Sequence, residues 1–120
     1  MGRERRKRRH HAECPAQILV PNLAPAEAVA IDLSVGGAFL ETGAALPLGL
    51  NVKVKLMPPG REPLFLTGRI LRVGYAEKAV RHGELDYLVV RAAGLAVKFD
   101  APDKATTTGF EAYLETLEEV

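Results

Sequence analysis

The sequence has no tryptophan, a single cysteine and few aromatic residues, which make up 6% of its 120 positions. The lone cysteine, Cys14, excludes an internal disulfide, and we therefore expect a reduced, cytoplasmic protein. No apolar run approaches the roughly 20 residues of a membrane-spanning helix, and the start lacks the apolar stretch of a secretory signal. These absences predict a protein without a membrane span.

Motifs for catalysis and metal binding are also missing. The sequence has no HExxH, CxxC or Walker lysine motif, and no histidine is placed by local sequence to activate Ser34. His10 and His11 are adjacent, so that in a strand they point to opposite faces and do not share one metal ion. We predict a protein that is not an enzyme, with no metal site and no cofactor.

Charge is distributed unevenly along the chain. Residues 1–11 hold five arginines and one lysine against one glutamate, a net charge of +5, whereas the whole chain has a net charge of +1. The other 109 residues therefore carry a net charge of −4. A basic arm on an acidic body indicates that the arm meets an anionic partner. We predict a flexible arm at residues 1–12 and a single domain at residues 13–120.

Short apolar runs separated by turn residues predict a mainly β domain. The runs that we expect to form strands are residues 12–20, 28–34, 36–42, 52–57, 64–75 and 94–99. Gly68, inside the longest run, is expected at a bulge or bend. Thr108 and Glu111 have the spacing of a capping box, which predicts a terminal helix at about 106–119. The element order indicates an antiparallel barrel or sandwich with a helix packed on one side.

The sequence of residues 74–93, before the last expected strand, does not indicate a single secondary structure. Residues 77–84 have the composition of a helical turn, whereas residues 87–90, "YLVV", fit either a strand or the wall of a long loop. The stretch is longer than a minimal barrel needs. It is either a partner surface or an embellishment without function.

The arm is dominated by arginine, which carries a planar guanidinium. Arginine can engage guanine O6 and N7 in a bidentate way, stack on a base or clamp a phosphate, whereas lysine supplies a diffuse charge. The five arginines in residues 3–9 therefore favour recognition of a shaped anion. On the arm alone, a solvated basic tail, or one that binds nucleic acid or membrane nonspecifically, is the more common interpretation.

The second motif is "DLSVGG", residues 32–37, between two expected strands. Taken alone it is more often a structural turn, because Asp and Ser cap backbone amides and glycine permits turn conformations. It can also bind a ligand. Asp32 can accept from the N1–H and N2–H of guanine, and Ser34 can donate to a phosphate or a base. Gly36 and Gly37 let a ligand approach the backbone. With the arginines, the motif fits a ligand with two guanines and two phosphates.

Together the two motifs resemble those of the PilZ domain, a bacterial receptor module for cyclic di-GMP. This family pairs an RxxxR motif near its N-terminus with a downstream (D/N)xSxxG on a β-barrel. The matching residues here are Arg5 and Arg9 in "RRKRR", and Asp32, Ser34 and Gly37 in "DLSVGG". The resemblance covers nearly the whole chain. It implies a six-stranded antiparallel split β-barrel with a C-terminal helix.

The resemblance also implies roles for these residues. Arg5 and Arg9 would grip guanine and phosphate groups of cyclic di-GMP. Asp32 and Ser34 would contact the same ligand from the barrel surface, and Gly37 would keep the turn open. The secondary candidates are Arg6, Arg8 and Gly36, among which Arg8 offers an alternative register for the arginine motif.

We therefore predict a stand-alone cytoplasmic receptor or adaptor for cyclic di-GMP. The arm is expected to be mobile without ligand and to fold across it, which presents a new surface to an unidentified downstream protein. Motility and biofilm formation are typical outputs of the family. One alternative is a PilZ-like adaptor that does not bind cyclic di-GMP. The other is a barrel that binds nucleic acid through the basic arm, against which the few aromatic residues give no evident stacking platform.

Overall fold

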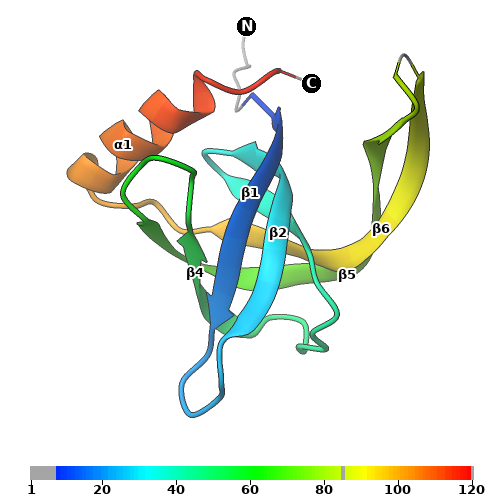
Figure 1. The fold of residues 1–120 in the computed structure, drawn as a ribbon. Helices are drawn as coiled ribbons and strands as arrows, with labels where there is room; N and C mark the ends of the chain where they lie inside the picture. The colour runs from blue at the N-terminus through cyan, green and yellow to red at the C-terminus, as the bar shows by residue number, and fades with distance from the viewer. Residues whose placement is uncertain (1–7, 85, 120) are drawn as a thin grey trace, which may run out of the picture.

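The computed structural model describes residues 8–84 and 86–119, and it shows six antiparallel strands followed by one helix (Figure 1). The elements are β1 (His10–Leu19), β2 (Ala26–Ser34), β3 (Gly37–Glu41), β4 (Asn51–Leu56), β5 (Leu64–His82), β6 (Asp86–Phe99) and α1 (Lys104–Leu114). The strands pair in the order β1-β2-β3-β6-β5-β4, and the pairing of β1 with β4 closes the sheet into a barrel. The predicted mainly β class, with six antiparallel strands and a C-terminal helix, is confirmed.

The core lies inside this closed sheet and is built from alternate residues of its strands. In β4, Val52, Val54 and Leu56 are buried, while the lysines between them are exposed or half-buried. Removing such apolar side chains from water is the main favourable term in folding. The helix joins the same core, because Phe110 of α1 packs edge to face against Phe99 of β6, with ring centroids 6.0 Å apart. One core therefore holds strands and helix together.

The helix begins and ends earlier than predicted, at Lys104 and Leu114 rather than at about 106 and 119. Its N-cap is Asp103, whose carboxylate accepts a hydrogen bond from a backbone N–H of the first turn at 2.7 Å. Thr108 lies inside the helix, where its hydroxyl donates to a backbone carbonyl one turn earlier at 3.0 Å. The predicted capping box at Thr108 is therefore wrong.

The start of β1 is held by the segment that follows α1. The backbone N–H of His11 donates to the carbonyl of Glu118 at 2.8 Å, and His10 forms an isolated bridge with Glu119. Because β1 begins at His10, the last three residues of the predicted arm belong to the barrel. The arm is therefore shorter than predicted on its C-terminal side.

Residues 74–93 belong to a long β-hairpin that projects beyond the barrel (Figure 1). β5 and β6 stay paired as far as His82 and Asp86, and Gly83 in the turn adopts a φ of +76°, which favours glycine. The helical turn considered for residues 77–84 is therefore wrong. Large apolar side chains exposed within residues 74–93 are Tyr75, Val80, Tyr87, Leu88 and Val89.

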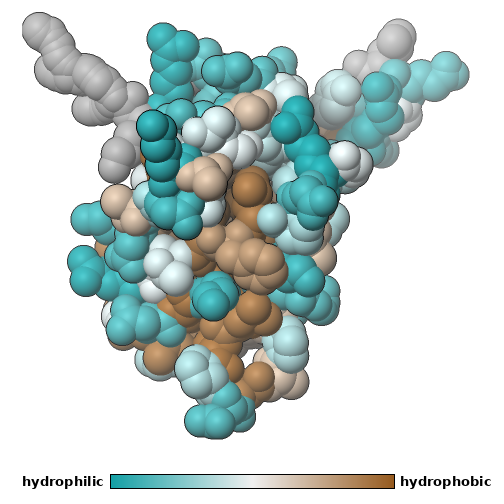
Figure 2. Space-filling view, turned by 90° about the vertical axis from the view of Figure 1, so that its left-hand side faces the viewer, coloured by the Kyte–Doolittle hydropathy of each residue, from teal (hydrophilic) through white to brown (hydrophobic). Residues whose placement is uncertain are grey.

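Apolar side chains also reach the surface of the barrel itself. Figure 2 shows a face on which apolar residues gather in the middle and lower part, with hydrophilic residues around them. The large apolar residues exposed outside residues 74–93 are Leu23, Val29, Leu48, Phe65, Leu71 and Val73. Exposed apolar residues are common on folded proteins. In the part of the chain that the structure describes, no helix is long and apolar enough to cross a membrane.

Candidate functional site

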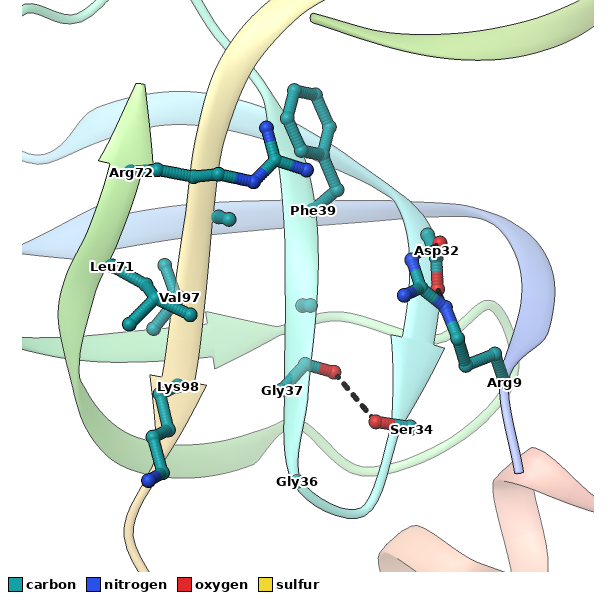
Figure 3. Close-up of a pocket in the computed structure, with 12 residues that line it drawn as sticks. Arg9, Asp32, Ser34, Gly36, Gly37, Phe39, Leu71, Arg72, Val97 and Lys98 are labelled. Atoms are coloured by element: carbon teal, nitrogen blue, oxygen red, sulfur yellow. Dashed lines mark hydrogen bonds and ion pairs between the residues drawn. The ribbon is translucent and has the colours of Figure 1, made fainter. Parts of the chain in front are cut away.

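The motif at residues 32–37 forms the connection between β2 and β3. Ser34 ends β2 and faces Gly37 at the start of β3, so that only Val35 and Gly36 lie in the turn. The Ser34 hydroxyl donates to the Gly37 carbonyl at 3.4 Å (Figure 3). The motif is thus a tight hairpin turn.

Asp32 forms a two-point ion pair with Arg9. The Arg9 Nε donates to Asp32 Oδ1 at 3.2 Å, and its Nη2 donates to Oδ2. Hydrogen bonding to Asp32 raises the pKa of the Arg9 guanidinium. The Arg9 side chain is 61% exposed, and exposed ion pairs contribute only about 0–1 kcal/mol to stability. The pair therefore positions charge at the surface more than it stabilises the fold.

Two rows of cross-strand neighbours form the floor around this pair. Residues directly opposite each other in paired strands present their side chains on the same face of the sheet. The first row runs across β2, β3, β6 and β5 through Asp32, Phe39, Ala96 and Arg72. The second row crosses β2, β3 and β6 through Ser34, Gly37 and Lys98. Residues distant in sequence therefore meet on the outer face of the barrel.

A pocket lies over these rows (Figure 3). The residues that line it are Arg9, Asp32, Ser34, Gly36, Gly37, Ala38, Phe39, Leu71, Arg72, Ala96, Val97 and Lys98. Five of the eight residues singled out from the sequence are among them. Arg8 is not, because it pairs with Glu119, with Nε and Oε2 3.3 Å apart. Arg5 and Arg6 lie outside the described residues.

Gly37 has a packing role that the sequence did not indicate. A Cβ at this position would lie 2.5 Å from the carbonyl oxygen of Val97 on β6, closer than real Cβ atoms approach. The residue therefore lets β3 pack tightly beside β6. Neither Gly36 nor Gly37 adopts a positive φ, so the turn does not need glycine for that reason.

Arg72, Lys98 and Phe39 are among the seven pocket residues that sequence reasoning missed. The register of β5 against β6 shifts between Ile70 and Arg72, which makes Leu71 the extra residue of a bulge. Bulges re-aim side chains, and this one turns Arg72 to the outer face. The bulge that was expected at Gly68 therefore lies at Leu71. Position 71 is a leucine between an isoleucine and an arginine, so no glycine or proline marks the bulge in the sequence.

Other reactive groups lie away from the pocket or do not cluster. Cys14 is fully buried in the core, and burial raises the pKa of its thiol. Across residues 8–84 and 86–119, no group of three or more His, Cys, Asp or Glu side chains is placed to hold a metal ion. The pocket brings polar, charged and aromatic groups together on one face of the barrel.

A closed six-stranded sheet with a C-terminal helix, and a pocket on its outer face beside a (D/N)xSxxG turn, define the PilZ class of domain. The family model for the PilZ domain matches residues 3–116. The chain therefore belongs to the PilZ domain family, and the resemblance seen in the sequence is confirmed. A search of the curated proteins finds no significant match.

Solved structures give the same fold. The PilZ domain of YcgR from Escherichia coli, solved with c-di-GMP, has a TM-score of 0.70 at 18% identity, over 96% of this chain and 92% of that chain. MotI/DgrA, an inhibitor of motility from Bacillus subtilis, has a TM-score of 0.66 at 11% identity. The match covers 95% of this chain and 51% of MotI/DgrA. MrkH, a c-di-GMP-dependent transcription regulatory factor, has a TM-score of 0.69 at 16% identity. The match covers 94% of this chain and 50% of MrkH. The chain spans about half the length of the last two.

Proposed function

We propose that this chain is a receptor for cyclic di-GMP and that the pocket over β2, β3, β6 and β5 binds the ligand. The observation that carries the proposal is the convergence of Arg9, Asp32 and Ser34 at one end of this pocket. Membership of the PilZ family, and a fold shared with the YcgR domain solved with c-di-GMP, support this choice of ligand. The family's members are receptors, which supports a binding function without catalysis.

The chemistry of these side chains suits guanine and phosphate. The Asp32 carboxylate can accept from the N1–H and N2–H of a guanine, and the Ser34 hydroxyl can donate to the ligand. The Arg9 guanidinium is planar and can bind a phosphate or the guanine O6 and N7 at two points. In this structure Arg9 and Asp32 engage each other. A ligand phosphate gives Arg9 another partner, which makes the Asp32 oxygens available to a guanine.

We further propose that Arg5 completes the grip from the arm. Arg5 is four positions before Arg9 and lies outside the described residues. Arg9 lies at the Asp32 end of the pocket, and four residues of chain are long enough to bring Arg5 to the same end. Ligand binding then selects the arrangement in which the arm covers the pocket, and this presents a new surface to a partner protein.

The test is isothermal titration calorimetry with cyclic di-GMP. A bidentate arginine–guanine pair is worth about 1–3 kcal/mol, so that Arg9→Ala is expected to raise Kd roughly 5- to 150-fold. Asp32→Ala is expected to weaken binding in the same range. Arg81→Ala is the matched control, because Arg81 is exposed near the tip of the hairpin and does not line the pocket.

Two results would contradict the proposal. The first is the absence of heat from the unaltered chain at high micromolar ligand. The second is unchanged affinity in the double variant Arg5→Ala, Arg9→Ala. A protein that binds nucleic acid through its arm would instead show steep salt dependence with DNA or RNA and no response to cyclic di-GMP.

A further inference from the structure

The pocket has a second end that the two sequence motifs do not explain. Arg72 of β5 lies in the same cross-strand row as Asp32, with Phe39 and Ala96 between them. Neighbouring strands are about 4.8 Å apart, so three strand spacings place the backbones of Asp32 and Arg72 about 14 Å apart. A ligand held only by Arg9, Asp32 and Ser34 would leave the far end unused.

Arg72 is presented to the pocket by its bulge and by an aromatic ring. Its guanidinium lies over Phe39, with Cζ 5.7 Å from the ring centroid, and Phe39 itself is only 3% exposed. Figure 3 shows the Arg72 side chain reaching across β6 toward Phe39. A guanidinium in cation–π contact with an aromatic ring is still planar and can offer a face to another planar group. The Arg72 guanidinium is therefore an exposed planar cation held beside a buried ring.

The surroundings of Arg72 keep this surface accessible. Ala96, its direct partner on β6, has only a methyl side chain above the floor. Across residues 8–84 and 86–119 no carboxylate forms an ion pair with Arg72, whereas Lys78 on the same strand pairs with Glu41 at 2.6 Å. Lys98 also lines the pocket, but its amino group points away from the Asp32 end (Figure 3).

We propose that Arg72 is a ligand-binding residue of the site, and that its guanidinium stacks on the second purine base of the bound cyclic dinucleotide. This inference rests on the proposed function, because it assigns the far end of the same pocket. One base lies at Asp32 and the other lies on Arg72. The ligand is thereby held by Asp32 on β2 and by Arg72, which reaches over the row from β5.

Calorimetric titration of cyclic di-GMP into four forms of the full chain tests this assignment. Arg72→Ala is expected to raise Kd at least about tenfold, which corresponds to about 1.4 kcal/mol. Arg72→Lys is expected to behave like the alanine variant, because an ammonium keeps the charge and loses the plane. Arg69→Ala is the matched control and is expected to stay within about twofold. Arg69 is exposed on the same strand, three residues earlier, and does not line the pocket.

The outcomes separate this inference from the proposed function. Wild-type affinity in Arg72→Ala overturns the role of Arg72 and leaves the proposed function standing. Wild-type affinity in Arg72→Lys overturns stacking, since charge alone would then suffice. A loss in Arg69→Ala as large as that in Arg72→Ala also overturns the assignment, because general positive charge would explain both. Absence of binding by the unaltered chain contradicts the proposed function itself.

Discussion

Asp32 directs its carboxylate to the Arg9 guanidinium, 23 positions earlier in the chain, rather than to a backbone amide of its own turn. Ser34 does bond within the turn, to the Gly37 carbonyl, yet its side chain also lines the pocket. The sequence allowed both roles for these residues. Their shared position at one end of the pocket supports the binding role. This position results from the pairing of strands that are distant in sequence, which a local sequence pattern does not reveal.

A residue outside the site, Asp103, controls a pH-dependent part of stability. Its hydrogen bonds to the N–H and hydroxyl of Thr106 lower its pKa from the ordinary 3.8. A carboxyl whose pKa is lower in the folded state stabilises the fold above its unfolded pKa, and this contribution is lost as pH falls through the folded pKa. We expect Asp103→Ala to lower the free energy of unfolding at pH 7, and the difference from wild type to shrink as pH falls below 3.8 and through the lowered pKa of the folded state. Urea denaturation across this range measures it, and a difference that does not change with pH would contradict the cap.

At the scale of elements, a strand with one buried face is easier to predict from the sequence than a strand exposed on both faces. β4 has one buried face, and its alternation was visible as a period of two. The outer part of the β5–β6 hairpin exposes apolar residues on both faces, such as Tyr75 on one and Leu88 on the other. Without a buried face its pattern has no clear period, which is why residues 77–84 also fitted a helical turn. Arg72 was missed for a related reason, since the bulge at Leu71 reverses the alternation on which such reasoning depends.

The same contrast predicts unequal contributions to stability along β6. Val89 is 68% exposed on the hairpin, whereas Leu95 is fully buried in the core. We expect Val89→Ser to change the free energy of unfolding by less than about 0.5 kcal/mol. Leu95→Ala is expected to cost about 2–5 kcal/mol, because it leaves a cavity in the core. Equal losses in urea denaturation would show that the hairpin is covered by another part of the chain or by a partner.

At the scale of the whole molecule, the residues that form the core and those that line the pocket lie on opposite faces of the barrel sheet. The inner face of its strands forms the core, and the outer face of β2, β3, β6 and β5 carries the pocket. Gly37 and Gly94 let backbone carbonyls of adjacent strands approach where a Cβ would collide, so that the rows keep their spacing. Exposed pocket residues such as Arg72 can therefore be replaced with little effect on the core.

The central claim is that cyclic di-GMP binds on this outer face. Titration of the isotopically labelled full chain with cyclic di-GMP, followed by amide NMR spectra, tests it most directly. The account predicts saturable shifts at Asp32, Ser34, Gly36 and Ala96, while amides within α1 such as that of Gly109 stay in place. Spectra that do not change at high micromolar ligand, or changes centred on α1 with the pocket unaffected, would contradict it.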